Sequence, residues 1–266
     1  MTLLIAVADA TTDAELVAAA RALAAAAGWD ARVVHVREPG AAVPESVQLH
    51  GLELTELEGD PAEALTGLVR REGVDAIAIG LRCGAEGVCE PGIGHVAEAL
   101  LVGAVAPVLL VRPGMRPLTT LRRMLVPLEG SPSASASMKA ADDAFCRRGR
   151  EIVMLHVVTG DTPSERGSLP APRMVDQEHY EWAAWQDEFA MRFSTCPEGG
   201  RHRVAVRVGR PALVIAEEAE KLAAELLVLS WSGTFAAGHG AVVRELLDTA
   251  PCPLLVVPSG PAAGEE

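Results

Sequence analysis

A glycine-rich loop between residues 80 and 95 holds the residues of this sequence whose types and spacing could bind a ligand. It contains five glycines, follows an apolar run and leads into a helical pattern. Glycines let several backbone amides turn toward one point, and a helix N-terminus adds about half a positive charge. This arrangement suits a phosphate group. Because glycine spacing alone is a weak signal, a tight turn without a ligand remains an equal alternative.

The other polar side chains of this loop do not favour a bound phosphate or a zinc site. Glu86 and Glu90 would repel a phosphate. Cys83 and Cys89 lack the spacing of a zinc site and have no further ligands nearby. No Ser-His-Asp set, carboxylate pair or histidine cluster stands out elsewhere, although distant residues could still assemble a site. The sequence therefore predicts no catalytic residue and no metal site.

The elements that position this loop occur twice in the chain. Residues 59–61 (Gly-Asp-Pro) open a helical stretch that runs into the apolar run 75–80, and residues 209–211 (Gly-Arg-Pro) open a stretch that runs into 225–230. Each copy then continues through a loop and a helix to Ala-Pro and a final strand. A repeat of this size is longer than a solenoid unit and matches a small α/β domain. It predicts two domains, residues 1–116 and 117–266.

Alternating strands and helices in each domain predict an α/β fold with a mostly parallel sheet and helices on both faces. The expected strands are 3–8, 32–36, 76–80 and 107–112, followed by 124–128, 152–158, 203–208, 226–230 and 253–258. In such sheets, ligands bind beyond the carboxyl ends of the strands. We therefore expect Asp9 and the loop 81–95 at one crevice, and Glu129 and the loop 231–241 at the other.

Composition limits the classes of partner. Aromatic residues make up 3% of the 266-residue chain and hydrophobic residues 49%, so the core must be built from Ala, Val and Leu. The net charge of −13 disfavours nucleic-acid binding. No run of about 20 apolar residues predicts a membrane span. Five scattered cysteines and an N-terminus without a basic region predict a reducing, cytoplasmic location.

Several of these motifs together resemble the universal stress protein family in its tandem form. They are Asp9 after the first strand, Gly59-Asp60-Pro61, the glycine loop, and Ala250-Pro251-Cys252-Pro253 before the last strand. The resemblance implies two Rossmann-like domains of the adenine nucleotide alpha hydrolase type, each with a five-stranded sheet. In the ATP-binding members of this family, the Asp contacts adenine, and the glycine loop with a final Ser or Thr holds ribose and phosphates.

The resemblance assigns nucleotide contacts in the first domain to Asp9, Gly80, Gly84, Gly92, Gly94 and His95. The match is partial in two places. Three residues separate Gly80 from Gly84, where the family has two, and His95 stands where the family has Ser or Thr. A neutral histidine can still donate one hydrogen bond.

The second domain matches less well. Its corresponding residues are Glu129, Gly233 and Gly240, with Glu129 in place of the Asp and only six residues between the two glycines. Ala241 takes the place of the hydroxyl residue, and Trp231 is expected to crowd the crevice. The sequence therefore predicts that this domain does not hold a triphosphate in the manner of the family.

The resemblance implies a regulatory or protective protein of the stress response, which is not an enzyme and binds ATP or another adenine nucleotide in its first domain only. One alternative is a protein-binding scaffold without a nucleotide. Another is a nucleotide-hydrolysing enzyme with Glu86 or Glu90 at a metal. The domains are expected to form a pseudo-dimer by pairing strands 107–112 and 253–258, and the chain could also form a homodimer with itself. The sequence names no protein partner.

Overall fold

The structure is a computed structural model of the 266-residue chain. It describes residues 1–8, 14–37, 51–81, 94–128, 134–145, 150–159, 201–235 and 238–258. We call residues 1–116 the first half and residues 117–266 the second half.

Strands and helices alternate along both halves. The first half contains β1 (Thr2–Val7), α1 (Ala14–Ala27), β2 (Asp30–Arg37), β3 (Leu54–Glu58), α2 (Pro61–Glu72), β4 (Ala76–Gly80), α3 (His95–Val102) and β5 (Val108–Val111). The second half contains β6 (Arg123–Pro127), α4 (Ala134–Phe145), β7 (Glu151–Val158), β8 (Arg201–Val208), α6 (Pro211–Lys221), β9 (Leu226–Trp231), α7 (His239–Thr249) and β10 (Leu254–Pro258).

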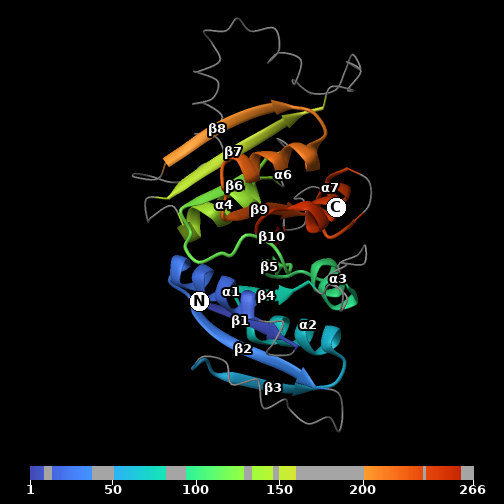
Figure 1. The fold of residues 1–266 in the computed structure, drawn as a ribbon. Coiled ribbons are helices and arrows are strands. Elements are labelled where there is room, and N and C mark those ends of the chain that lie inside the picture. Colours follow the sequence, from blue (N-terminus) through green and yellow to red (C-terminus); the bar gives the residue numbers. More distant parts are fainter. Residues whose placement is uncertain are drawn as a thin grey trace, which may run out of the picture.

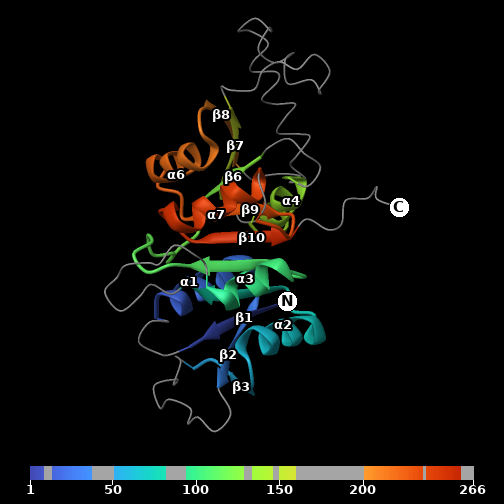
Figure 2. The same cartoon turned by 90° about the vertical axis from the view of Figure 1, so that its right-hand side faces the viewer.

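All the described strands belong to one ten-stranded sheet, in the order β3-β2-β1-β4-β5-β10-β9-β6-β7-β8. Each half contributes five strands with the same relative order, and the described pairs within each half are parallel. The halves meet where β5 pairs antiparallel with β10, with Leu109 opposite Leu255 (Figure 2). We call this pairing the seam. The predicted α/β fold is confirmed, but the two predicted sheets are halves of one continuous sheet.

Helices cover both faces of this sheet, and each face has a core that crosses the seam. Helices α2, α3, α6 and α7 lie on one face, and α1 and α4 lie on the other (Figure 1). Successive residues of β5 and β10 point to opposite faces, so Leu110 and Leu254 join the first core while Leu109 and Leu255 join the second. Both cores are largely aliphatic, as the composition predicts. No helix among the described residues has both the length and the apolar content that a bilayer crossing requires.

Helix α2 begins where the Gly-Asp-Pro motif predicts. The Asp60 carboxylate accepts a hydrogen bond from the Glu63 backbone amide at 3.0 Å, and Pro61 occupies the first turn. Gly73 then ends the helix with a φ of 59°. The second copy keeps Pro211, but Arg210 at the N-cap makes no side-chain capping bond. The repeat therefore preserves the helix position while losing one of its local signals.

Strand β3 was missed by the sequence analysis, which predicted no strand between residues 36 and 61. It is an edge strand in which Glu56 and Glu58 are exposed and Leu57 is only half-buried. Its apolar pattern is therefore weak, and pairing with β2 holds it in place. The sequence also predicts a capping box that begins at Thr12, a helix cap at Ser131, and a helix that carries Trp182, Trp185 and Phe189, and these residues lie outside the described part of the chain.

The Pro- and Gly-containing segment 112–117 reads in the sequence as a linker between the halves, but in the structure it is fastened to the second half. The Arg116 backbone amide donates to the Pro251 carbonyl at 2.7 Å, and its guanidinium donates to the Ala224 carbonyl at 2.8 Å. The Arg112 guanidinium donates to the Ala250 carbonyl at 3.1 Å. Because Met115 is buried as well, the segment forms part of the folded junction.

A buried carboxylate joins β8 to the helix that covers it. The Glu218 side chain, on α6, is 7% exposed and lies 2.8 Å from Arg207 and 3.2 Å from Lys221. The Arg207 hydrogen bond holds the pKa of the Glu218 carboxyl below its usual value of 4.5, while burial acts in the opposite direction and Lys221 assists Arg207.

We predict that Glu218→Gln lowers the free energy of unfolding by about 1–2 kcal/mol at pH 7, because it removes a charge-assisted bond in a buried setting. A lowered folded-state pKa stabilises the protein above pH 4.5, and this contribution is lost as the pH falls through the folded-state pKa. Urea unfolding at pH 7, 5 and 3.5 should show the wild type converging on the variant at low pH. Glu217→Gln, on the exposed side of the same helix, is the control. A difference that is independent of pH would contradict the prediction.

Candidate functional site

The first candidate site lies at the carboxyl edge of the first half. Strand β1 lies between β2 and β4, so the chain leaves β1 toward one side while β4 lies on the other. This is the position at which parallel sheets open a crevice. Gly80, at the end of β4, is half-buried there. Asp9, Gly84 and Gly92 lie outside the described residues.

The N-terminus of α3 lies at this edge, and its first two positions are not covered by any residue that the structure describes. Gly94 is the N-cap with a φ of 74°, which suits glycine, and a Cβ placed there would meet no heavy atom of the described residues within 4 Å. The Glu98 amide donates to the Gly94 carbonyl at 3.0 Å. The amides of residues 95–97 therefore have no partner within the helix. His95 is the first helical residue and is exposed. Together these groups can donate hydrogen bonds to an anion.

A histidine fixes the end of the first strand in each half. Nδ1 of His35 lies 3.0 Å from the Val7 carbonyl, and Nδ1 of His156 lies 2.9 Å from the Leu128 carbonyl, each across 28 residues. Since a carbonyl oxygen can only accept, Nδ1–H is the donor in both bonds. Both histidines therefore make a structural hydrogen bond. The bonds fix the backbone just before Asp9 and Glu129.

The corresponding helix start in the second half is covered by its own loop. Helix α7 begins at His239 after Gly238 at the N-cap (φ 82°), so Gly238 holds the place that Gly94 holds in α3. Gly240 is buried in the first turn, and a Cβ there would lie 2.2 Å from the Thr234 carbonyl oxygen and 2.9 Å from Phe235 Cα. The backbone of residues 234–235 therefore lies directly against the first turn of α7. Gly233 precedes this stretch with a φ of 84°, and Glu129 lies outside the described residues.

The end of β9 is also covered. His239 Nε2 donates to the Ser230 carbonyl at 2.6 Å and lies 3.4 Å from the Ser230 hydroxyl. Ser230 is 2% exposed, whereas its counterpart Gly80 is half-buried. The helix start of the second half thus has an N-cap glycine as α3 does, but groups of its own loop and of β9 lie against its first turn.

Trp231 makes a contact that the sequence does not predict. Its indole Nε1–H donates to the Leu101 carbonyl, at the end of α3, at 2.7 Å, and the residue is 1% exposed. Phe235 packs on Trp231 with ring centroids 4.5 Å apart, and the Arg244 guanidinium lies 4.9 Å above the Phe235 ring. This aromatic cluster joins the second half to α3. Nothing in the local sequence around Trp231 signals a partner 130 residues away.

Other groups that could do chemistry have structural surroundings. Cys252 is fully buried, and burial raises the pKa of its thiol to about 12, which makes it unreactive. Asp142 is 3% exposed and lies 2.9 Å from His202 Nε2, in a pair between α4 and β8. The described part of the chain contains no group of three or more His, Cys, Asp or Glu side chains that could hold a metal ion.

Comparison with known proteins gives a consistent result. A model of the universal stress protein family matches residues 120–258, which is about half of the chain. A universal stress protein of Mycobacterium tuberculosis (strain CDC 1551) is 30% identical over 220 residues, and one of Mycobacterium bovis is 29% identical over the same length. In both cases the match covers 77% of this chain and 66% of the relative, so the chain spans just under two thirds of these relatives.

Solved structures agree over nearly the whole chain. A universal stress protein from Archaeoglobus fulgidus has a TM-score of 0.68 at 16% identity, covering 97% of this chain and 98% of its own. A protein of the same description from Pseudomonas aeruginosa has a TM-score of 0.63 at 13% identity, with 97% and 92% covered. At these identities the likeness concerns the fold.

We predict that Trp231→Phe destabilises the protein by about 1–2 kcal/mol, because it removes the donor to Leu101 and leaves a small gap beside Phe235. The loss should be modest, since the Leu101 carbonyl also accepts from the Ala104 amide at 3.1 Å. Urea unfolding measures the change. Trp29→Phe is the control, because Trp29 is half-buried and its indole makes no hydrogen bond to the residues that the structure describes. Equal losses in the two variants would show that the bond to α3 contributes nothing.

Proposed function

Because the chain belongs to the universal stress protein family, we propose that it is a regulatory or protective protein of the stress response that binds an adenine nucleotide in its first half only. The observation that carries this proposal is the difference between two equivalent helix starts. At α3, Gly94 and His95 are exposed, and no described residue lies within 4 Å of a Cβ placed on Gly94. At α7 the N-cap Gly238 is equally clear of described residues, but the first turn is covered, because a Cβ on Gly240 would lie 2.2 Å from the Thr234 carbonyl oxygen.

Each group in the first half has a role in this proposal. The phosphates contact the free amides of residues 95–97, where the helix dipole favours negative charge. His95 donates a hydrogen bond in place of the family's Ser or Thr. Gly80 lets the backbone approach closely at the end of β4. Asp9 accepts a hydrogen bond from adenine, with the His35 bond to Val7 fixing the strand before it. The contributions of Asp9, Gly84 and Gly92 rest on the resemblance of the sequence motifs.

We further propose that the two halves are tandem copies that associate as the subunits of a dimer would. The same strand order in both halves, the seam, and the two histidine bonds across 28 residues support this. A second candidate function is a protein-binding scaffold that works without a nucleotide. The covered helix start of the second half favours this function, because the backbone of Thr234 and Phe235 lies against the first turn of α7, where a ligand would otherwise bind. Hydrolysis through Glu86 or Glu90 remains an alternative from the sequence alone.

The test is calorimetric titration of the whole chain with ATP. We expect one nucleotide per chain, with affinity lowered about tenfold or more by Asp9→Ala and severalfold by His95→Ala, since each removes a hydrogen bond to the ligand. The matched substitutions in the second half, Glu129→Ala and His239→Ala, should leave the affinity unchanged. Absence of heat and of any thermal shift at millimolar ATP would favour the scaffold. Loss of binding through the second-half variants would place the site in the wrong half.

A further inference from the structure

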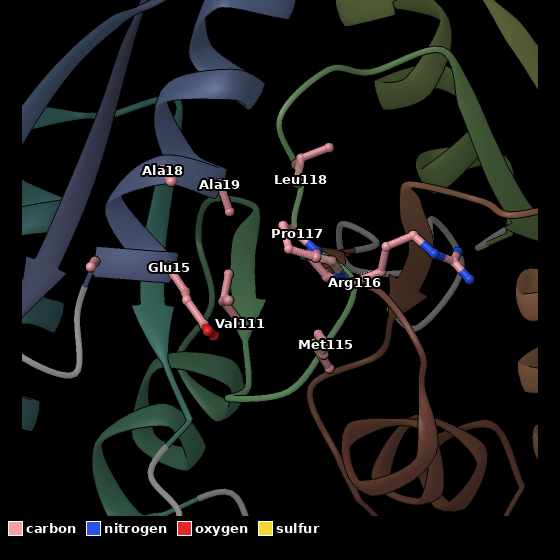
Figure 3. Close-up of a pocket in the computed structure, with 10 residues that line it drawn as sticks. Glu15, Ala18, Ala19, Val111, Met115, Arg116, Pro117 and Leu118 are labelled. Atoms are coloured by element: carbon pink, nitrogen blue, oxygen red, sulfur yellow. The ribbon is translucent and has the colours of Figure 1, made fainter.

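A cavity of about 220 Å³ lies at the junction of the halves (Figure 3). It is bounded by the first turns of α1, the end of β5, the segment 115–118 and the start of β10. Helix α1 covers one face of the sheet and α3 the other, so the cavity and the start of α3 belong to different layers. The inference below therefore does not depend on the nucleotide proposal.

The walls of this cavity are aliphatic. Val111, Met115 and Leu118 are buried and line it, together with Ala19 on the buried side of α1. Ala18 lies at the exposed side. A compact apolar group entering here would exchange water for contacts with these side chains, which is favourable. The volume exceeds the roughly 150 Å³ that accommodates benzene in a dry cavity, and it falls short of the roughly 300 Å³ at which drug-sized pockets begin.

One carboxylate defines the charge of the cavity. Glu15 lines it with its carboxylate turned toward Val111, and no described residue forms an ion pair or hydrogen bond with this carboxylate (Figure 3). Arg116 also lines the cavity, but its guanidinium is turned to the other side (Figure 3), where it donates to Glu220 at 2.7 Å and to the Ala224 carbonyl. Arg116, the cation among the lining residues, therefore does not neutralise the negative charge of Glu15.

We propose that this cavity is a binding site for a small ligand with a protonated amino group on a compact apolar body. The ammonium group pairs with Glu15 at the opening, and the apolar body fills the space between α1 and the segment 115–118. An anion is disfavoured because Glu15 would repel it. Since Arg112 and Arg116 fasten the adjoining segment to the second half, a bound ligand contacts the connection between the halves and raises the melting temperature.

The probe is benzylamine, titrated against the whole chain by ligand-observed NMR, with benzyl alcohol as its uncharged counterpart. A ligand of this size should bind with a Kd of about 1 mM. Benzyl alcohol should bind about fivefold or more weakly. Glu15→Gln should abolish the preference for the amine. The matched control is Glu63→Gln, which removes an exposed first-turn glutamate from α2 and should leave the preference intact.

A second variant tests the cavity itself. Ala18→Leu, on the exposed side of α1, fills the space without disturbing the core, so it should weaken both probes about tenfold while the thermal unfolding curve keeps its shape. ATP binding should be unchanged in Glu15→Gln and Ala18→Leu, which separates this site from the nucleotide proposal. The inference is overturned if the wild type binds neither probe, if it binds both equally, or if binding survives both variants.

Discussion

The antiparallel pairing of β5 with β10 is the constraint on which the rest of the structure depends. Both strands consist largely of Val and Leu and are almost fully buried. If either were an open edge of the sheet, it would expose apolar side chains and unpaired backbone N–H and C=O groups to water. Their pairing makes one sheet from two parallel halves and carries both cores across the junction. Because the pairing is antiparallel, the carboxyl edges of the two halves face in opposite directions.

This opposition determines which groups meet at the junction. The end of β5 lies beside the end of helix α7, and the end of β9 lies beside the end of helix α3. Helix ends leave carbonyl groups without helical partners. Arg112 donates a hydrogen bond to the Ala250 carbonyl, and Trp231 donates one to the Leu101 carbonyl. Arg150 does the same for the Ala26 carbonyl at the end of α1, at 3.1 Å. The cavity beside Glu15 also lies at the junction, between the start of α1, the end of β5 and the segment 115–118.

The sequence predicts the elements whose signals lie within a short stretch of the chain. Asp60 and Pro61 predict the start of α2, because the capping contacts are local. Unbroken apolar runs predict the central strands, because these strands are buried on both faces. Strand β3 could not be found in this way, since its stability comes from pairing with β2. The role of Trp231 could not be found either: its partner belongs to the other half, and only the folded sheet brings them together. The seam was expected from the family resemblance rather than from any pattern in the strands.

Loop length accounts for the covered helix start of the second half. Residues 81–94 connect β4 to α3, whereas only residues 232–238 connect β9 to α7. The short connection brings the Thr234 carbonyl against Gly240, a position that only glycine can occupy at this separation. The same short path brings Trp231 and Phe235 within reach of α3. Shortening the loop thus closes one helix start and supplies the contact that secures the helix bearing the other.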